Sequence, residues 1–288
     1  MIEGKNILIT GATDGIGKET AKQLAFSNHA ITILGRNPEK AEKVISELKA
    51  ETNNDQINFN QVDLSSLKSI ENVINQLQTE NKKFDILINN AGTFHTSLAY
   101  TEDNIEMQFG VNHLASFLLT NLILEKKLLS EKARIINISS NAHYFAKINF
   151  DDVFYEKKYD GFKVYAQSKL ANVLFTAELA KKLAGTQITV NSLHPGEIAT
   201  NFAFTNSNGL YNFLWKIASP FLSSIEKGAK TSVYLATSPD VDGISGFFFN
   251  KQKKQKPSSY SMNAAIQQKF WKFSESMLKK HKKPAPTL

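Results

Sequence analysis

The stretch ITGATDGIG, Ile9 to Gly17, lies where a run of apolar residues ends and a helical pattern begins. Its glycines, at positions 11, 15 and 17, allow a tight turn and a close approach of the backbone to a ligand, because glycine has no Cβ. A helix that starts there directs its unpaired N–H groups and the positive end of its dipole at the turn, which suits a pyrophosphate. The alternative is a turn that needs glycine only for positive φ.

Short apolar runs alternate with segments of helical periodicity along the chain. Strands are expected at Asn6–Thr10, Ala30–Leu34, Ile57–Val62, Phe84–Asn89, Arg134–Ser139, Ile188–Leu193 and Gly246–Phe249, and helices at 16–27, 38–51, 66–81, 102–129, 163–184 and 226–237. Strands rich in Ile, Leu and Val with little alternation are typical of a parallel sheet that is buried on both faces. We therefore predict one α/β domain over residues 1–250, a Rossmann-like, doubly wound parallel sheet of about seven strands with helices on both faces.

Charge is distributed unevenly along the 288 residues, whose net charge is +7. From Lys251 onward there are ten lysines and one acidic residue, so this part carries +9 and the first 250 residues carry −2. The clusters KQKKQK and KKHKKP suit an anionic membrane surface or a nucleic acid. Blocks of like charge are, however, commonly solvated tails. We expect residues 251–288 to form a basic extension, partly helical with a flexible end, and we expect no nucleic-acid partner.

Several classes of site and location are disfavoured by what the chain lacks. It has no cysteine, which excludes disulfides, thiolate metal sites and cysteine nucleophiles. The six histidines show no metal-ligand spacing, so no metal is expected. The sequence shows neither a signal-peptide pattern nor an apolar run of about 18 residues, which favours a soluble, cytoplasmic protein.

The glycine stretch is the first of a series of motifs along the chain. They are TGATDGIG at Thr10–Gly17, NNAG at Asn89–Gly92, VNHL with Asn112, RIINISS ending at Ser140, YAQSK at Tyr165–Lys169 and HPGEIAT at His194–Thr200. In order and spacing they resemble the short-chain dehydrogenase/reductase family over about residues 5 to 250. The further matches GIGKETA, GRN, VNHL and FWKFSESML make the chain most similar to the retinol dehydrogenase-like, WW-domain oxidoreductase-like branch.

The chemistry can be argued from the side chains. Tyr165 and Lys169 are four residues apart, so they share one face of a helix. An ammonium beside a phenol lowers a phenol pKa that is ordinarily about 10. Tyr165 would then act as acid and base in hydride transfer between a nicotinamide and a carbonyl or alcohol. Ser140, at the end of a strand, would bind the substrate oxygen, with Ser139 as the alternative.

The resemblance adds roles that the residues alone do not establish. It implies that Asn112 holds a water of a proton relay and that Lys169 binds the nicotinamide ribose. The cofactor-binding residues that we expect are Gly11, Thr13, Asp14, Gly15, Ile16, Gly17, Arg36, Asn37, Asp63, Leu64, Asn90, Ala91, Gly92, Tyr165, Lys169, Pro195, Gly196, Ile198 and Thr200.

The end of the second strand bears on which dinucleotide is bound. It reads Leu34-Gly35-Arg36-Asn37, with an arginine where an acidic residue would select NAD. An arginine suits a 2′-phosphate, so NADP(H) is the expected cofactor. Asp14 in the glycine loop is a contrary sign, because a carboxylate there repels a phosphate unless it points away.

Two aromatic stretches bear on the substrate. One is FAKINFDDVFYEKKYDGF between Ser140 and Tyr165, and the other is 197–225, which contains Phe202. They suit an apolar carbonyl or alcohol, with Ser140, Tyr165 and Phe202 as substrate-binding residues. The alternative is that these aromatics pack against the protein or a dimer partner. We also expect weak peripheral membrane contact through YNFLWKIASPFL and a homodimer formed through 102–129 and 163–184.

Two other functions fit less well. A non-catalytic nucleotide sensor would not need Ser140, Tyr165 and Lys169 intact. A nucleotide-sugar epimerase or dehydratase usually has another glycine spacing and a larger C-terminal domain.

Overall fold

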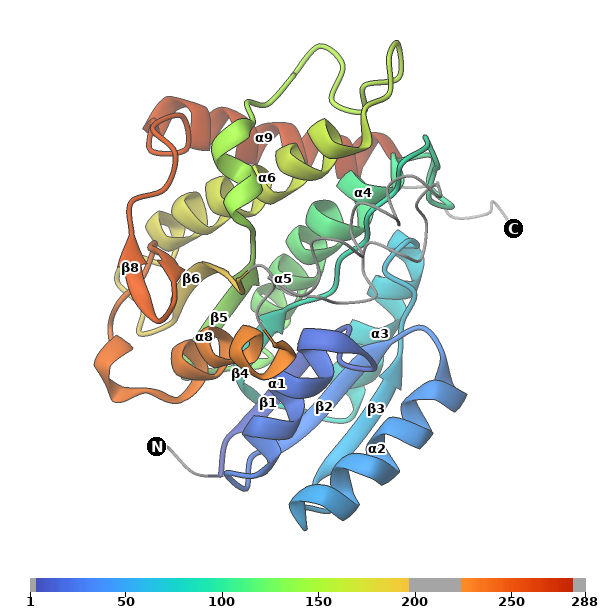
Figure 1. The fold of residues 1–288 in the computed structure, drawn as a ribbon, viewed down its shortest axis with the longest axis vertical. Coiled ribbons are helices and arrows are strands. Elements are labelled where there is room, and N and C mark those ends of the chain that lie inside the picture. The colour runs from blue at the N-terminus through green and yellow to red at the C-terminus, as the bar shows by residue number, and fades with distance from the viewer. Residues whose placement is uncertain (1–3, 197–223, 282–288) are drawn as a thin grey trace.

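The computed structural model describes residues 4–196 and 224–281, which build one eight-stranded sheet (Figure 1). The strands are β1 (Asn6–Thr10), β2 (Ala30–Gly35), β3 (Ile57–Gln61), β4 (Phe84–Asn89), β5 (Leu129–Ile138), β6 (Thr189–His194), β7 (Phe248–Asn250) and β8 (Lys253–Gln255). Their order is β3-β2-β1-β4-β5-β6-β7-β8, and within the described residues only the β7–β8 pair is antiparallel. The strand order reverses direction beside β1, as in a doubly wound sheet, which confirms the predicted fold class.

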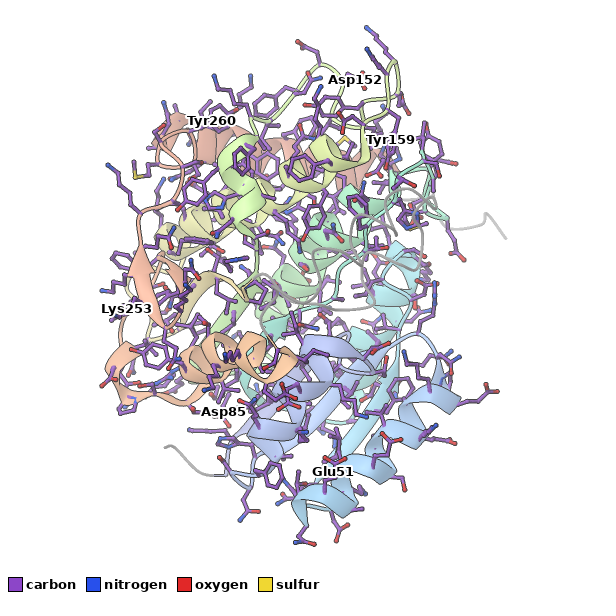
Figure 2. All side chains as sticks on the ribbon, viewed as in Figure 1. Glu51, Asp85, Asp152, Tyr159, Lys253 and Tyr260 are labelled. Carbon is purple, nitrogen blue, oxygen red and sulfur yellow. The ribbon has the colours of Figure 1, made fainter. Side chains whose placement is uncertain are left out.

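The strand β8 was not among the expected strands. It consists of exposed residues and pairs with β7 across a turn in which Lys251 and Gln252 have φ of +49° and +63°. Two consecutive residues with positive φ form a two-residue hairpin turn, and the residues at these positions are usually Asn-Gly or Asp-Gly. Lys-Gln gives no such signal, and the lysine-rich strand, with Lys253 at the edge of the molecule in Figure 2, lacks an apolar pattern.

Helices cover both faces of the sheet (Figure 1). They are α1 (Gly15–Ala25), α2 (Pro38–Thr52), α3 (Leu67–Thr79), α4 (Met107–Phe109), the π-helical turn η1 (Gly110–Leu114), α5 (Ala115–Glu125), the 3₁₀ turns η2 (Asn141–Phe145) and η5 (Pro239–Val241), α6 (Gly161–Lys182), α8 (Ile225–Thr237) and α9 (Ala264–His281). No helix within the described ranges is long and apolar enough to cross a membrane.

Two hydrophobic layers hold these helices on the sheet. Side chains alternate between the faces of a strand, so Ile7 and Ile9 of β1 face one layer and Leu8 faces the other. The first layer contains buried residues of α1, α2 and α8, and the second contains those of α3, α5, α6 and α9. Burial on both faces explains why the central strands β1 and β4 consist mostly of apolar residues.

The helix expected over 102–129 is shorter and is not regular. The chain turns at Asn104, whose φ is +56°, and helical structure begins at Met107. One π-helical turn interrupts it, and α5 ends at Glu125, two residues before the left-handed Lys127. Leu129, expected as the end of the helix, is the first residue of β5. The apolar pattern continues across this boundary, so periodicity did not reveal it.

The C-terminal helix α9 packs into the body of the protein. Its residues Phe270, Trp271 and Met277 are buried in the same layer as α5 and α6. The Trp271 ring lies 4.8 Å from that of Phe117 in α5 and 5.8 Å from that of Phe175 in α6. A homodimer through the outer surfaces of α5 and α6, which stays a prediction, would have to share this region with α9. The domain boundary at residue 250 also stays a prediction.

Candidate active site

The glycine turn joins β1 to α1 and touches the end of β4. Gly11 has a φ of +66°, and a Cβ on it would lie 2.9 Å from the Cα of Ala91. A Cβ on Gly17 would collide with the Gly11 carbonyl and the Asn90 side chain. These two glycines are therefore required by the close packing of the three segments. The turn also leaves the start of α1 at the carboxyl edge of the sheet, where a phosphate can meet the helix N-terminus.

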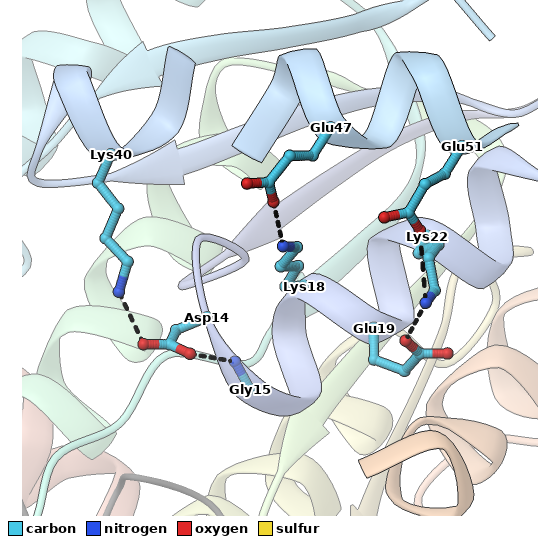
Figure 3. A network of polar contacts seen from close by, with 8 residues as sticks. All are labelled: Asp14, Gly15, Lys18, Glu19, Lys22, Lys40, Glu47 and Glu51. Carbon is cyan, nitrogen blue, oxygen red and sulfur yellow. Dashed lines mark hydrogen bonds and ion pairs between the residues drawn. The ribbon is translucent and has the colours of Figure 1, made fainter. Parts of the chain in front are cut away.

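Asp14 caps the start of α1 and is paired with a neighbouring cation (Figure 3). One carboxylate oxygen accepts from the Gly15 amide at 2.8 Å, and the other lies 2.7 Å from the Lys40 ammonium of α2. The hydrogen bond from Lys40 is the main reason that the pKa of Asp14 is lowered. Its charge is thus paired, which weakens the objection that it would repel a phosphate. Figure 3 also shows Lys18 of α1 paired with Glu47 of α2.

The expected adenosine-side residues follow β2 and β3. Arg36 is exposed, and its carbonyl accepts from the Gln61 side chain at 3.1 Å. Asn37 caps α2 by accepting from the Lys40 amide at 2.8 Å. Asp63 accepts from the amide and the hydroxyl of Ser65 at 2.9 and 2.7 Å. The side chains of Asn37 and Asp63 thus have structural bonds of their own, while Arg36 presents an exposed cation.

The remaining small residues of the expected cofactor site lie at the same edge of the sheet. Thr13, Ile16, Leu64, Gly92, Pro195 and Gly196 are half-buried there. The Thr10 hydroxyl accepts from the amides of Asn90 and Ala91, each at 2.9 Å, and thereby joins the ends of β1 and β4. The expected residues Ile198, Thr200 and Phe202 lie outside the described residues.

Asn112 lies in the π-helical turn and is fully buried. Its side-chain oxygen accepts from the Thr93 amide at 2.6 Å, and its amide group donates to the Thr93 carbonyl and the Ser168 hydroxyl, both at 3.0 Å. The Ser168 hydroxyl donates onward to the Tyr165 carbonyl at 2.7 Å. A π-helical turn is a common device at functional sites, because it re-aims a side chain. Here it points Asn112 at the helix that carries Tyr165.

The two neighbouring serines at the end of β5 have different surroundings. The Ser139 hydroxyl is buried and donates to the Lys169 carbonyl at 2.7 Å. The Ser140 hydroxyl is half-buried, accepts from the Ala142 amide at 3.2 Å and hydrogen-bonds the Tyr165 phenol. Of the two serines, Ser140 therefore has the hydroxyl that faces Tyr165.

Tyr165 and Lys169 share one face of α6, as their spacing predicts. The Lys169 ammonium lies 5.5 Å from the centroid of the Tyr165 ring and 3.4 Å from the Ile138 carbonyl. Burial raises the pKa of Tyr165 to about 12, against which the hydrogen bond from Ser140 acts. Burial also lowers the pKa of Lys169 to about 8. The expected lowering of the phenol pKa is thus not found in this protein without a dinucleotide, because desolvation outweighs the distant ammonium.

The aromatics inserted between Ser140 and Tyr165 pack mostly against the protein. Phe150 contacts Phe273 of α9, and Phe154 contacts Phe109 of α4. The Tyr159 hydroxyl, labelled in Figure 2, donates to the Glu106 carboxylate at 2.9 Å. The ends of the insertion differ, because Phe145 and Phe162 are 80% and 46% exposed. The second aromatic stretch lies almost entirely outside the described residues.

Sequence reasoning missed several polar residues around these side chains. Ser168 and Asn172 lie three residues after Tyr165 and Lys169 on α6, and both hydrogen-bond Asn112. Their i+3 spacing places them on the same helical face, so the signal was present in the sequence. Thr93 and His143 gave no comparable signal, because Thr93 bonds Asn112 only through its own main chain and His143 bonds only main-chain groups.

Known proteins are similar to this chain in sequence. The sequence profile described as short chain dehydrogenase matches residues 5–209. Retinol dehydrogenase 12 of Mus musculus is 42% identical over 277 residues, which cover 96% of this chain and 87% of that protein. The chain belongs to the short-chain dehydrogenase family. Retinol dehydrogenase 13 of Homo sapiens is 41% identical, with 94% of this chain and 83% of that protein covered, which confirms the resemblance to the retinol dehydrogenase branch.

Solved structures have the same fold. A protein from Mycobacterium Paratuberculosis superposes with a TM-score of 0.77 at 28% identity, covering 96% of this chain and 94% of the other. A short chain dehydrogenase from Burkholderia cenocepacia, solved in complex with NADP, superposes with a TM-score of 0.68 at 25% identity, covering 86% and 96%. As a member of the family, this short-chain dehydrogenase is an oxidoreductase of alcohol or carbonyl groups that uses a nicotinamide cofactor.

Proposed function

We propose that this short-chain dehydrogenase transfers a hydride between NADP(H) and an apolar carbonyl or alcohol, with Tyr165 as the acid and base. The observation that carries the proposal is the hydrogen bond between the Ser140 and Tyr165 hydroxyls, beside Lys169. The bound nicotinamide would supply or accept the hydride. The protein's part is to hold the substrate oxygen and to move one proton.

The protonation state of the phenol suits its proposed role as the acid in reduction. With a pKa of about 12, Tyr165 carries its proton at neutral pH. It can donate this proton to the oxygen of a carbonyl, on which negative charge develops as the hydride arrives. Ser140 is placed to donate a second hydrogen bond to the same oxygen. Oxidation of an alcohol needs the phenolate instead, and that state costs more in this buried place.

Lys169 and Asn112 would support Tyr165 without touching the substrate. Lys169 is buried, and its pKa of about 8 leaves it mostly protonated at neutral pH. It can therefore bind hydroxyls of the cofactor ribose and keep a positive charge close to the phenol. Asn112 is bonded through Ser168 to the carbonyl of Tyr165, which fixes the helix turn that carries the phenol.

The preference for NADP(H) rests on the cations near the glycine turn. Arg36 is exposed at the end of β2, and Lys40 lies one helical turn into α2, where it already holds Asp14. A guanidinium binds a phosphate dianion through charge-assisted hydrogen bonds. Arg36 is therefore proposed to bind the 2′-phosphate, and Lys40 to keep Asp14 from opposing it.

The proposed substrate is apolar. The relatives are named retinol dehydrogenases, so a retinoid is one candidate, alongside fatty aldehydes and polycyclic ketones. Phe94 contacts the Tyr165 ring edge-on at 5.7 Å, which places an apolar surface beside the phenol. Phe145, which is 80% exposed at the end of η2, adds another aromatic side chain to the segment that follows Ser140.

Separate titrations with NADPH and NADH test this proposal first. We expect NADPH to bind more tightly, and reduction of apolar aldehydes and ketones to consume it. A preference for NADH would contradict the role of Arg36. Failure to bind either dinucleotide would contradict the enzymatic function itself and favour a protein that uses this fold for interactions alone. A cytoplasmic location and weak contact with membranes stay predictions.

A further inference from the structure

Two buried histidines near the active site have no part in the chemistry above. His143 lies in η2, three residues after Ser140, and His113 lies in η1, directly after Asn112. Both side chains are fully buried. Each ring has one nitrogen directed at the catalytic region and the other at the segment 251–281, which contains β8 and α9.

His143 connects the main chain of Ser140 to that of Ser258. Its Nδ1 lies 2.7 Å from the Ser140 carbonyl oxygen, and its Nε2 lies 3.2 Å from the Ser258 amide nitrogen. A carbonyl only accepts and a main-chain amide only donates, so the proton must be on Nδ1 and Nε2 must be the acceptor. Burial lowers the pKa of His143 and keeps the ring in this neutral form.

The neighbouring side chain ties down the same segment. The Tyr144 hydroxyl donates to the Lys256 carbonyl at 2.6 Å and accepts from the Gln255 side chain at 2.9 Å. The His143 ring lies 4.7 Å from the ring of Phe248 in β7. Residues 255–258 are thus bound along η2, immediately beyond Ser140.

His113 makes a second connection, from α9 to Asn112. Its Nδ1 lies 3.2 Å from the Asn172 side-chain oxygen, and its Nε2 lies 3.0 Å from the Ser274 hydroxyl. The Asn172 amide group donates to the Asn112 carbonyl at 2.9 Å, which turns its oxygen towards His113. Nδ1 therefore carries the ring proton, and the Ser274 hydroxyl donates its own proton to Nε2. The Phe270 carbonyl oxygen, 3.1 Å from the Ser274 hydroxyl, competes as an acceptor for that hydroxyl proton. Burial lowers the pKa of His113 to about 3, so the ring stays neutral.

We propose that the segment 251–281 positions the catalytic residues, acting on Ser140 through His143 and on Asn112 through His113 and Asn172. The proposal rests on the proposed roles of Ser140 and Asn112. A hydrogen bond to a carbonyl restrains its peptide plane, which restrains the Cα–Cβ direction from which the side chain starts. The histidines and the C-terminal segment would therefore affect turnover more than binding.

Substitution of each histidine by phenylalanine tests the proposal in the full-length protein. His143→Phe and His113→Phe keep an aromatic ring in an aromatic surrounding and remove both hydrogen bonds. We expect kcat for NADPH-dependent carbonyl reduction to fall about ten-fold or more in each, with KM and the NADPH Kd within about two-fold of the wild type. The matched control is His281→Phe, because His281 also joins α9 to a main-chain carbonyl, that of Asp103, at 2.8 Å. This control should keep its kcat.

Two outcomes would overturn the proposal. One is an unchanged kcat in both variants. The other is an equal loss in His281→Phe, because that would show a general loosening of α9. If the phenylalanine variants do not fold, the pair Ser274→Ala and Ser276→Ala replaces them. The Ser274 hydroxyl bonds His113, whereas the exposed Ser276 hydroxyl donates to the Phe273 carbonyl, so only Ser274→Ala should lower kcat.

A measurement that does not require enzymatic activity tests the two histidine connections separately from the proposed function. Nitrogen-15 NMR of the wild-type histidine rings should show the neutral Nδ1–H tautomer for both His113 and His143 at pH 6 to 8. The Nε2–H tautomer, or an ordinary histidine titration in either ring, would overturn the proposed connections. Wild-type protein that reduces no carbonyl would contradict the proposed function, while the tautomers would still show whether the two connections exist.

Discussion

The hydroxyl of Ser139 donates to the carbonyl of Lys169 at 2.7 Å, so one strand end carries a serine that supports the structure beside a serine that faces Tyr165. Ser139 joins the end of β5 to the part of α6 that carries Tyr165 and Lys169. The next residue, Ser140, points to the opposite side of the strand, because side chains alternate. This difference between two adjacent serines leads to the first prediction.

Ser140→Ala should lower kcat about 100- to 1000-fold, the usual loss when one donor to a developing oxyanion is removed. Ser139→Ala should instead lower the free energy of unfolding by about 1 kcal/mol and keep most of the activity. Steady-state kinetics and urea unfolding of both variants check this. If Ser139→Ala is the less active enzyme, Ser139 is the catalytic serine and Ser140 the structural one, contrary to this prediction.

Tyr165→Phe should abolish turnover and leave NADPH binding close to that of the wild type. The variant removes the transferable proton and keeps the ring that contacts Phe94. Tyr100→Phe is the matched control, because the Tyr100 hydroxyl bonds the Glu156 carboxylate on the surface, and it should stay active. Calorimetric titration with NADPH and a carbonyl assay decide the matter. Activity retained in Tyr165→Phe would falsify the assigned acid and base.

Arg36→Asp should weaken NADPH binding about 10- to 100-fold, as expected for the loss of charge-assisted hydrogen bonds. NADH, which lacks the 2′-phosphate, should lose little affinity. Lys40→Ala should also weaken NADPH, because it releases the Asp14 carboxylate. Adding Asp14→Asn to Lys40→Ala should restore part of that loss. An equal effect of Arg36→Asp on both dinucleotides would show that Arg36 does not bind the phosphate.

Lys169→Met should stabilise the protein without dinucleotide at pH 7, by roughly 1 to 3 kcal/mol. The folded-state pKa of Lys169 is about 8, below its usual 10.5, so burial of its charge costs stability below pH 8. Between about pH 8 and 10.5 the unfolded chain binds more protons than the folded one, and the wild type therefore recovers stability as the pH rises. Urea unfolding at pH 7 and pH 10 measures this. If the difference in free energy of unfolding between the variant and the wild type is as large at pH 10 as at pH 7, the lowered pKa of Lys169 is contradicted.

Gly17→Ala should destabilise the fold by about 1 to 3 kcal/mol even without a cofactor, because its Cβ would collide with the Gly11 carbonyl and the Asn90 side chain. Gly35→Ala is the control, since its Cβ would meet Phe59 and Thr13 at 3.4 and 3.5 Å, ordinary contact distances. Thermal unfolding of both proteins gives the comparison. Equal melting temperatures of the two variants would show that Gly17 is needed for ligand binding and not for the fold.

The regular part of the fold could be read from local patterns. The strands β1 to β4 and the helices α1 to α3 lie within a few residues of their expected bounds, because buried strands and amphipathic helices repeat apolar residues at fixed spacings. The region 102–129 could not be read in this way. Its π-helical turn and the start of β5 depend on packing that leaves the apolar pattern unchanged.

The sequence by itself determined the doubly wound sheet and the family, and it supplied the proposed set of catalytic side chains, because motif spacing and periodicity are local properties of the chain. Tertiary structure decided which serine faces Tyr165, that Asp14 is paired with Lys40, and that burial raises the phenol pKa. It also showed a helix of the lysine-rich segment packed into the core. These features depend on desolvation and on contacts between residues far apart in the chain, which no local pattern records.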